Sequence, residues 1–169
     1  VPMLPTDILG YLAKMRHITG VAKTKAATEF VEEFILECDR KLVIFTYHKA
    51  ANAILEGNIR AICEKEEINI APPLNLTAEL DMNQRVNMIE EFRKPENRIM
   101  LASIGASAEG LNLQFCSDCL ITERQWNPSQ EEQAEARFPR PGSTADRVNA
   151  TYLIAAGTID DFLTSIVEE

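Results

Sequence analysis

Several features that identify large classes of protein are missing from this sequence. In 169 residues, no apolar run reaches the ~18–20 residues that a transmembrane helix requires. Acidic residues outnumber basic ones, 26 against 17, and the net charge of −9 excludes nucleic-acid binding by bulk positive charge. Apolar residues make up 46% and charged residues 25%, so the chain has enough core-forming residues for a globular domain.

Cysteine is scarce as well, with four residues in the chain. Only Cys116 and Cys119 are close together, and no second pair or nearby His completes a zinc-binding set. We therefore interpret these cysteines as small buried hydrophobic residues near a strand.

The sequence also lacks a phosphate-binding loop and an Asp-Glu pair that would hold Mg²⁺ and activate water. The segment from Gly20 to Thr24 superficially resembles the end of such a loop. In the real motif, however, Gly stands directly before Lys and a strand precedes the loop. Here Ala22 precedes Lys23 and a helical pattern precedes the turn, while His17 and His48 are isolated. The chain is therefore not expected to hydrolyse a nucleotide by itself.

What the chain does have is an alternation of helical and strand patterns. Helices are predicted at about 6–18, 26–38, 50–65, 81–92 and 127–139, with a last one capped by Thr158. In the helix at 81–92, Met82, Val86 and Ile89 are predicted to face inward. Strands are predicted at 42–45, 99–102, 119–122 and 152–154, and an interrupted one spans 68–76 around Pro72-Pro73. This order predicts a three-layer α/β fold with a parallel sheet covered by helices on both faces.

In a parallel α/β sheet, ligands bind at the carboxyl ends of the strands. The predicted loops there span residues 46–49, 77–81, 103–110 and 123–127. The segment 103–113 is rich in Ser, Gly and Ala, so its backbone N–H groups are suited to phosphate oxygens. The same residues also fit a plain strand-to-helix turn.

Arginines gather in the acidic second half of the chain, at Arg124, Arg137, Arg140 and Arg147. Gln130, Gln133 and Arg137 share one face of the predicted helix, and Pro139 ends that helix just before Arg140. Because Arg forms fork-like contacts with phosphate, the two arginines are placed to grip a polyphosphate from two directions. Glu131, Glu132 and Glu135 would fit a solvated helix instead.

Taken together, these segments resemble the second, C-terminal RecA-like helicase lobe of the SWI/SNF family of superfamily-two DNA-dependent ATPases, and within it the annealing-helicase branch. The resemblance covers about residues 12–162. It rests on five blocks in family order, at 41–47, 78–85, 103–113, 123–128 and 133–142. Ala78, Ala136, Pro139 and Ser143 depart from the family pattern, whereas both motif-six arginines match it.

The resemblance implies that ATP with Mg²⁺ binds between two lobes, with the metal held by a first lobe that this chain lacks. Arg137 and Arg140 would be the catalytic arginine fingers. The implied nucleotide-binding set is Glu109, Gly110, Asn112 and Gln133. The implied nucleic-acid-binding set is Ser103, Gly105, Thr77, Arg85 and Thr46, with Tyr47 and His48 as weaker candidates.

As domain organisation, we expect one helicase C-terminal lobe over 1–169, with leading helices at 1–40 and a RecA-like core at 41–169. The implied partners are the first lobe of the same protein and double-stranded DNA, with no membrane. The implied location is intracellular, in the cytoplasm or nucleoid or in the nucleus. The isolated lobe is expected to be inactive. Two alternatives remain: an RNA-helicase lobe of the same architecture, and a catalytically degenerate module that binds proteins.

Overall fold

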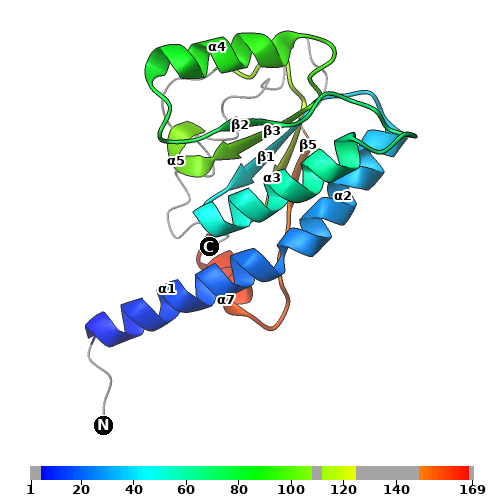
Figure 1. The fold of residues 1–169 in the computed structure, drawn as a ribbon. Helices are drawn as coiled ribbons and strands as arrows, with labels where there is room; N and C mark the ends of the chain where they lie inside the picture. The colour runs from blue at the N-terminus through cyan, green and yellow to red at the C-terminus, as the bar shows by residue number, and fades with distance from the viewer. Residues whose placement is uncertain (1–4, 108–111, 125–148, 168–169) are drawn as a thin grey trace.

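The computed structural model describes residues 5–107, 112–124 and 149–167, and its elements alternate along the chain (Figure 1). The helices are α1 (Pro5–Ala22), α2 (Thr24–Glu37), α3 (Lys49–Cys63), α4 (Met82–Arg93), α5 (Ile104–Ser107) and α7 (Ile159–Val167). The strands are β1 (Leu42–Thr46), β2 (Leu74–Leu76), β3 (Ile99–Ser103), β4 (Asp118–Ile121) and β5 (Asn149–Tyr152).

The strands form one five-stranded sheet in the order β2-β3-β1-β4-β5, and every neighbouring pair is parallel. β1 is the central strand, with Thr46 opposite Ser103 of β3 and Phe45 opposite Ile121 of β4. The carboxyl ends of β1 and β3 therefore lie side by side at one edge of the sheet. This confirms the predicted parallel α/β fold.

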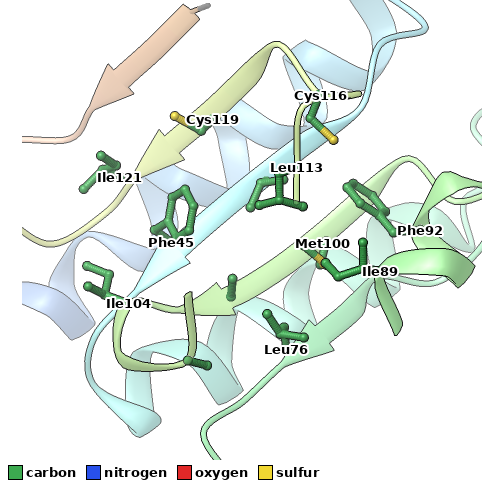
Figure 2. Packing of buried hydrophobic residues seen from close by; sticks show 13 residues of the cluster. Phe45, Leu76, Ile89, Phe92, Met100, Ile104, Leu113, Cys116, Cys119 and Ile121 are labelled. Atoms are coloured by element: carbon green, nitrogen blue, oxygen red, sulfur yellow. The ribbon is translucent and has the colours of Figure 1, made fainter. Parts of the chain in front are cut away.

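Alternate residues of the central strands enter two separate cores, because successive strand residues point to opposite faces. Val43, Phe45, Met100 and Ile121 pack with Ile89 and Phe92 of α4 in one cluster. Figure 2 shows this cluster, in which Ile89 and Phe92 lie beside Met100. Leu42, Ile44 and Leu101 enter the other cluster, with α2 and α3. Helices thus cover both faces of the sheet, which makes three layers (Figure 1).

The structure corrects the predicted inward face of α4. Met82 and Val86 are exposed, whereas Arg85, Ile89 and Phe92 are buried. The helix begins at a capping box, in which the Asp81 carboxylate accepts from the Gln84 N–H and the Gln84 side chain accepts from the Asp81 N–H.

Three predicted boundaries also differ. The first helix continues to Ala22 rather than ending near residue 18, and Lys23 alone separates it from α2. Residues 68–70 form a turn after α3 instead of a strand, because the Ile68 and Asn69 N–H groups bond back to the Lys65 carbonyl and Asn69 has a φ of 44°. The last strand begins at Asn149 and ends at Tyr152. The helix predicted at 127–139 lies outside the described residues.

Candidate functional site

A pocket of about 370 Å³ lies at the carboxyl ends of β1, β2 and β3. We call it the carboxyl-edge pocket. Three of the loops predicted to carry function contribute to it, together with α3. Its lining residues are Thr46, Tyr47, Lys49, Asn52, Ala53, Glu56, Asn75, Thr77, Ala78, Glu79, Ser103 and Gly105.

Four of the five residues predicted to bind nucleic acid line this pocket. Thr46 ends β1, Thr77 follows β2, and Ser103 and Gly105 lie at the junction of β3 and α5. These positions are far apart in sequence and meet because parallel strands end at one edge of the sheet. The weaker candidate Tyr47 lines the pocket too, and its side chain is 47% exposed.

The fifth predicted residue, Arg85, lies behind the pocket rather than in its lining. Its side chain is buried, and Nη2 donates to the Ala78 carbonyl at 3.0 Å. Ala78 itself lines the pocket. Arg85 therefore supports the loop after β2 from inside the fold.

A polar network that sequence analysis missed lies between β1, β2 and α3. Asn52 Nδ2 donates to Thr46 Oγ1 at 2.9 Å and to Asn75 Oδ1 at 3.3 Å. Asn75 Nδ2 donates to Asn52 Oδ1 at 2.7 Å and to Glu56 Oε2 at 2.9 Å. The sequence held one signal for it: Asn52 is a polar residue on the buried face of α3, between Ala51 and Leu55. A buried amide requires hydrogen-bond partners, and here they line a pocket.

Two exposed lining residues of the pocket form an ion pair. Lys49 Nζ lies 2.5 Å from Glu79 Oε1, and both side chains are largely exposed. The hydrogen bond between them raises the pKa of Lys49 and lowers that of Glu79. Exposed pairs contribute little to stability, so this one leaves both side chains able to take other partners.

Glu123, directly after β4 and Thr122, is a second residue whose role the sequence did not reveal. Its side chain is buried, and Oε2 accepts from the Tyr47 N–H at 2.7 Å and from the His48 N–H at 3.0 Å. Its Oε1 lies 2.5 Å from His48 Nδ1. Gly20 of α1 lies against the same carboxylate. The carboxylate thus joins the loop between β1 and α3 to the end of β4.

The predicted nucleotide-binding and catalytic residues fall mostly outside the described part of the chain. Glu109, Gly110, Gln133, Arg137 and Arg140 lie outside it. Asn112 is described: it is exposed, and its Oδ1 accepts from the Gln114 N–H at 3.1 Å. An exposed side-chain amide is compatible with contact to a bound nucleotide.

The segment that resembles a phosphate loop has a structural role. Lys23 is buried between α1 and α2, and its Nζ lies 2.6 Å from Asp160 Oδ2 and 3.1 Å from the Leu153 carbonyl. Asp160 Oδ2 also accepts from the Ala155 N–H at 3.0 Å. Lys23 therefore binds α7 to the leading helices.

Over the described residues, no cluster of His, Cys, Asp and Glu is arranged to hold a metal ion. Cys63, Cys116 and Cys119 are buried, as predicted for small hydrophobic residues, and Cys38 is half-buried. Burial raises the pKa of the Cys116 thiol to about 12 and also raises that of Cys63.

These environments predict selective labelling by a thiol reagent, because the thiolate is the reactive form. In the native protein, Cys38 is expected to react first, and the three buried cysteines only after unfolding. A disulfide-exchange assay with a chromogenic reagent measures this as one fast equivalent per chain. The Cys38→Ser variant should lose that fast equivalent, and its persistence would contradict the assignment.

The chain is similar to known proteins in both sequence and fold. The sequence model of the helicase conserved C-terminal domain matches residues 23–142, which is more than half of the chain. The DNA annealing helicase and endonuclease ZRANB3 is 27% identical over 157 residues in both Mus musculus and Homo sapiens. The match covers 92% of this chain and 14% of each relative. The SWI/SNF-related matrix-associated actin-dependent regulator of chromatin subfamily A-like protein 1 of Xenopus tropicalis is 28% identical over 89% of this chain and 15% of that protein.

Solved structures agree on the fold. The C-terminal part of the Fun30 ATPase domain superposes with a TM-score of 0.73 at 24% identity, covering 85% of this chain and 44% of that one. The C-terminal domain of the Sulfolobus solfataricus SWI2/SNF2 ATPase superposes with a TM-score of 0.71 at 22% identity, covering 99% of this chain and 72% of that one. In the described part of the chain, no helix is long and apolar enough to span a membrane.

Proposed function

The chain belongs to the helicase conserved C-terminal domain family, with the sequence and fold of an SWI/SNF C-terminal lobe, and from that premise we propose that it is the second motor lobe of a DNA-dependent ATPase. In this proposal, ATP binds between this lobe and a first lobe elsewhere in the same protein. Duplex DNA passes over the carboxyl-edge pocket. Opening and closing of the two lobes over each ATP cycle then drives translocation, remodelling or strand annealing.

The observation that carries the proposal is the convergence of Thr46, Thr77, Ser103 and Gly105 on one pocket. Hydroxyl groups and backbone N–H groups are among the protein donors to phosphate oxygens, beside Arg and Lys. Thr46 is fully buried and bonded to Asn52, so Thr77, Ser103 and the Gly105 backbone are the accessible members of this set. Apart from its chain neighbours and its own helix, Gly105 has no heavy atom within 4 Å of the position that a Cβ would take, so a strand of nucleic acid can approach its backbone closely. The relatives named as DNA annealing helicases support DNA rather than RNA as the polymer.

On the nucleotide side, the proposal rests on the sequence motifs. ATP with Mg²⁺ would supply the phosphoryl group that is cleaved, and the first lobe would hold the metal. Arg137 and Arg140 would stabilise the negative charge that develops on the phosphates, and Gln133 would orient them. The exposed amide of Asn112, together with Glu109 and Gly110, would contact the nucleotide.

The DNA side of the proposal is tested with Gly105→Asp in the full-length protein. A carboxylate at this open position places a negative charge where the phosphate backbone would pass. The KM of the ATPase for duplex DNA should rise by about tenfold, equivalent to about 1.4 kcal/mol. Steady-state ATP hydrolysis, titrated with duplex DNA and separately with structured RNA, measures it.

Gly10→Asp is the matched control, because it makes the same change at an exposed and equally open position on α1. It should leave the KM for DNA unchanged. Stimulation by RNA and not by DNA would favour the RNA-helicase alternative. If Gly105→Asp and Gly10→Asp have the same KM for duplex DNA, the pocket does not contact the nucleic acid.

A further inference from the structure

The Glu123 carboxylate holds the start of the loop between β1 and α3 through three hydrogen bonds. A carboxylate only accepts, so the Tyr47 N–H, the His48 N–H and His48 Nδ1 all donate to it. The exposed fraction of Glu123 is 4%, so the carboxylate depends on protein donors rather than on bulk solvent. Because His48 is the N-cap residue of α3, the carboxylate that accepts from its N–H lies near the positive end of that helix.

The other side of the carboxylate is closed by α1. A Cβ added at Gly20 would lie 2.0 Å from Glu123 Oε1 and 2.9 Å from its Cδ, so only glycine fits while the carboxylate keeps this position. Gly20 lies inside α1, where glycine costs helix stability relative to alanine by about 1 kcal/mol. The close approach of α1 to Glu123 gives a physical reason for glycine at this position.

The same loop provides part of the carboxyl-edge pocket. Tyr47 is exposed at the pocket, and Thr46 directly before it receives the hydrogen bond from Asn52. The Arg16 guanidinium of α1 lies 4.9 Å from the centre of the Tyr47 ring and donates to the Arg124 carbonyl at 3.1 Å. Helix α1 thus touches both the pocket loop and the end of β4.

We propose that Glu123 is a positioning residue for the nucleic-acid pocket, and that α1, through its contact at Gly20, sets where this carboxylate holds Tyr47 and His48. The inference rests on the proposed function, because the pocket's occupant is the DNA backbone. It adds that the leading helix, which lines no part of the pocket, controls the affinity of the pocket for DNA.

The test moves the carboxylate without changing any residue of the loop. In Gly20→Ala, the new Cβ displaces the flexible end of Glu123 while the substitution itself favours the helix. In the full-length protein, the KM for duplex DNA should rise by about tenfold or more, with kcat at saturating DNA kept within about twofold. Gly10→Ala makes the same substitution in α1 with nothing within 4 Å of the new Cβ, and should leave the KM unchanged.

Hydrogen exchange of the Tyr47 and His48 amides measures directly whether their hydrogen bonds to Glu123 persist. Both N–H groups bond to Glu123, so they should exchange faster in Gly20→Ala and not in Gly10→Ala. Glu123→Gln is the second variant: it keeps the size of the side chain and one accepting oxygen, so its rise in KM should be smaller than that of Glu123→Ala.

The outcomes separate the two proposals. If the wild-type ATPase does not respond to duplex DNA, the proposed function is wrong. If the wild type responds and Gly20→Ala matches Gly10→Ala in KM, the positioning role is overturned, whether or not the amides exchange faster. Loss of kcat at an unchanged KM, together with a lower unfolding midpoint, would show that Glu123 has a purely structural role and would also overturn it.

Discussion

Replacing Arg137 or Arg140 with alanine in the full-length protein is expected to lower ATP turnover by ~10³ or more. The reason is that negative charge develops on the phosphate oxygens during phosphoryl transfer. A positioned guanidinium stabilises this charge, and an alanine side chain does not. Binding of duplex DNA should change little, because four of the five candidate DNA-contacting residues line the pocket at the ends of β1, β2 and β3. Single-turnover and steady-state ATP hydrolysis, with DNA binding measured in parallel, check both parts.

Two comparisons make this prediction specific. Arg147→Ala removes a member of the same arginine cluster that lies outside the motif, so it should leave turnover close to wild type. Arg137→Lys keeps the charge but loses the planar fork, so most of the loss should remain. Turnover of Arg137→Ala and Arg140→Ala within about threefold of wild type would reject the arginine-finger assignment.

The largest effect on stability is expected at Lys23. Its Nζ and the Asp160 carboxylate form a buried ion pair, and Lys23→Met would leave that carboxylate buried without its cation. Breaking a buried pair from one side typically costs about 3–5 kcal/mol. For a domain of this size, that corresponds to a fall of roughly 10 °C in the unfolding midpoint. Thermal or urea unfolding followed by circular dichroism measures it.

The control is a lysine in an exposed pair. Lys94 lies 2.6 Å from Glu91 with both side chains half in solvent, so Lys94→Met should leave the midpoint almost unchanged. Replacing both partners, as Lys23→Met with Asp160→Leu, should recover part of the loss, because no uncompensated charge then remains buried although the Ala155 N–H loses its acceptor. A midpoint for Lys23→Met equal to that of Lys94→Met would contradict this account.

The positions of most strands could be predicted because the signals for a buried strand are local, whereas the order of the strands in the sheet could not. Residues 42–45 and 99–102 are apolar on both faces, which is the pattern of a strand covered by helices on both sides. Parallel strands that end together then determine which loops meet. The pocket residues Thr46, Thr77 and Ser103 could therefore be grouped from sequence although they are far apart along the chain.

The inward face of α4 shows where that reasoning fails. Two sets of residues have the same helical spacing and share Ile89: Met82, Val86 and Ile89, and Arg85, Ile89 and Phe92. Periodicity alone therefore does not decide which set faces inward. Hydrophobicity favours the first set, but the fold buries the second. The long Arg85 side chain packs inside while its guanidinium reaches the Ala78 carbonyl, a partner that only the tertiary structure supplies.

Gly20 and Glu123 could not be paired for a similar reason. A glycine near the end of a predicted helix indicates a stop, and nothing in the sequence indicates that the carboxylate of Glu123, which follows β4, lies where a Cβ at Gly20 would be. The helix continues past Gly20 to Ala22. Contacts between residues about a hundred positions apart leave no periodic trace in either segment.

The charges that line the pocket determine how strongly its binding of DNA would depend on salt concentration. Among its described lining residues, Lys49 is the one cation, and the lining also carries the carboxylates of Glu79 and Glu56. Each neutralised phosphate contributes about −0.9 to the slope of log K against log salt, so binding through these residues would release few counterions. The contribution of this pocket to DNA binding would then depend on the shape of the pocket and change little with ionic strength. A motor that must release and rebind its track in every cycle can use such a grip, because it does not have to overcome strong electrostatic adhesion at each step.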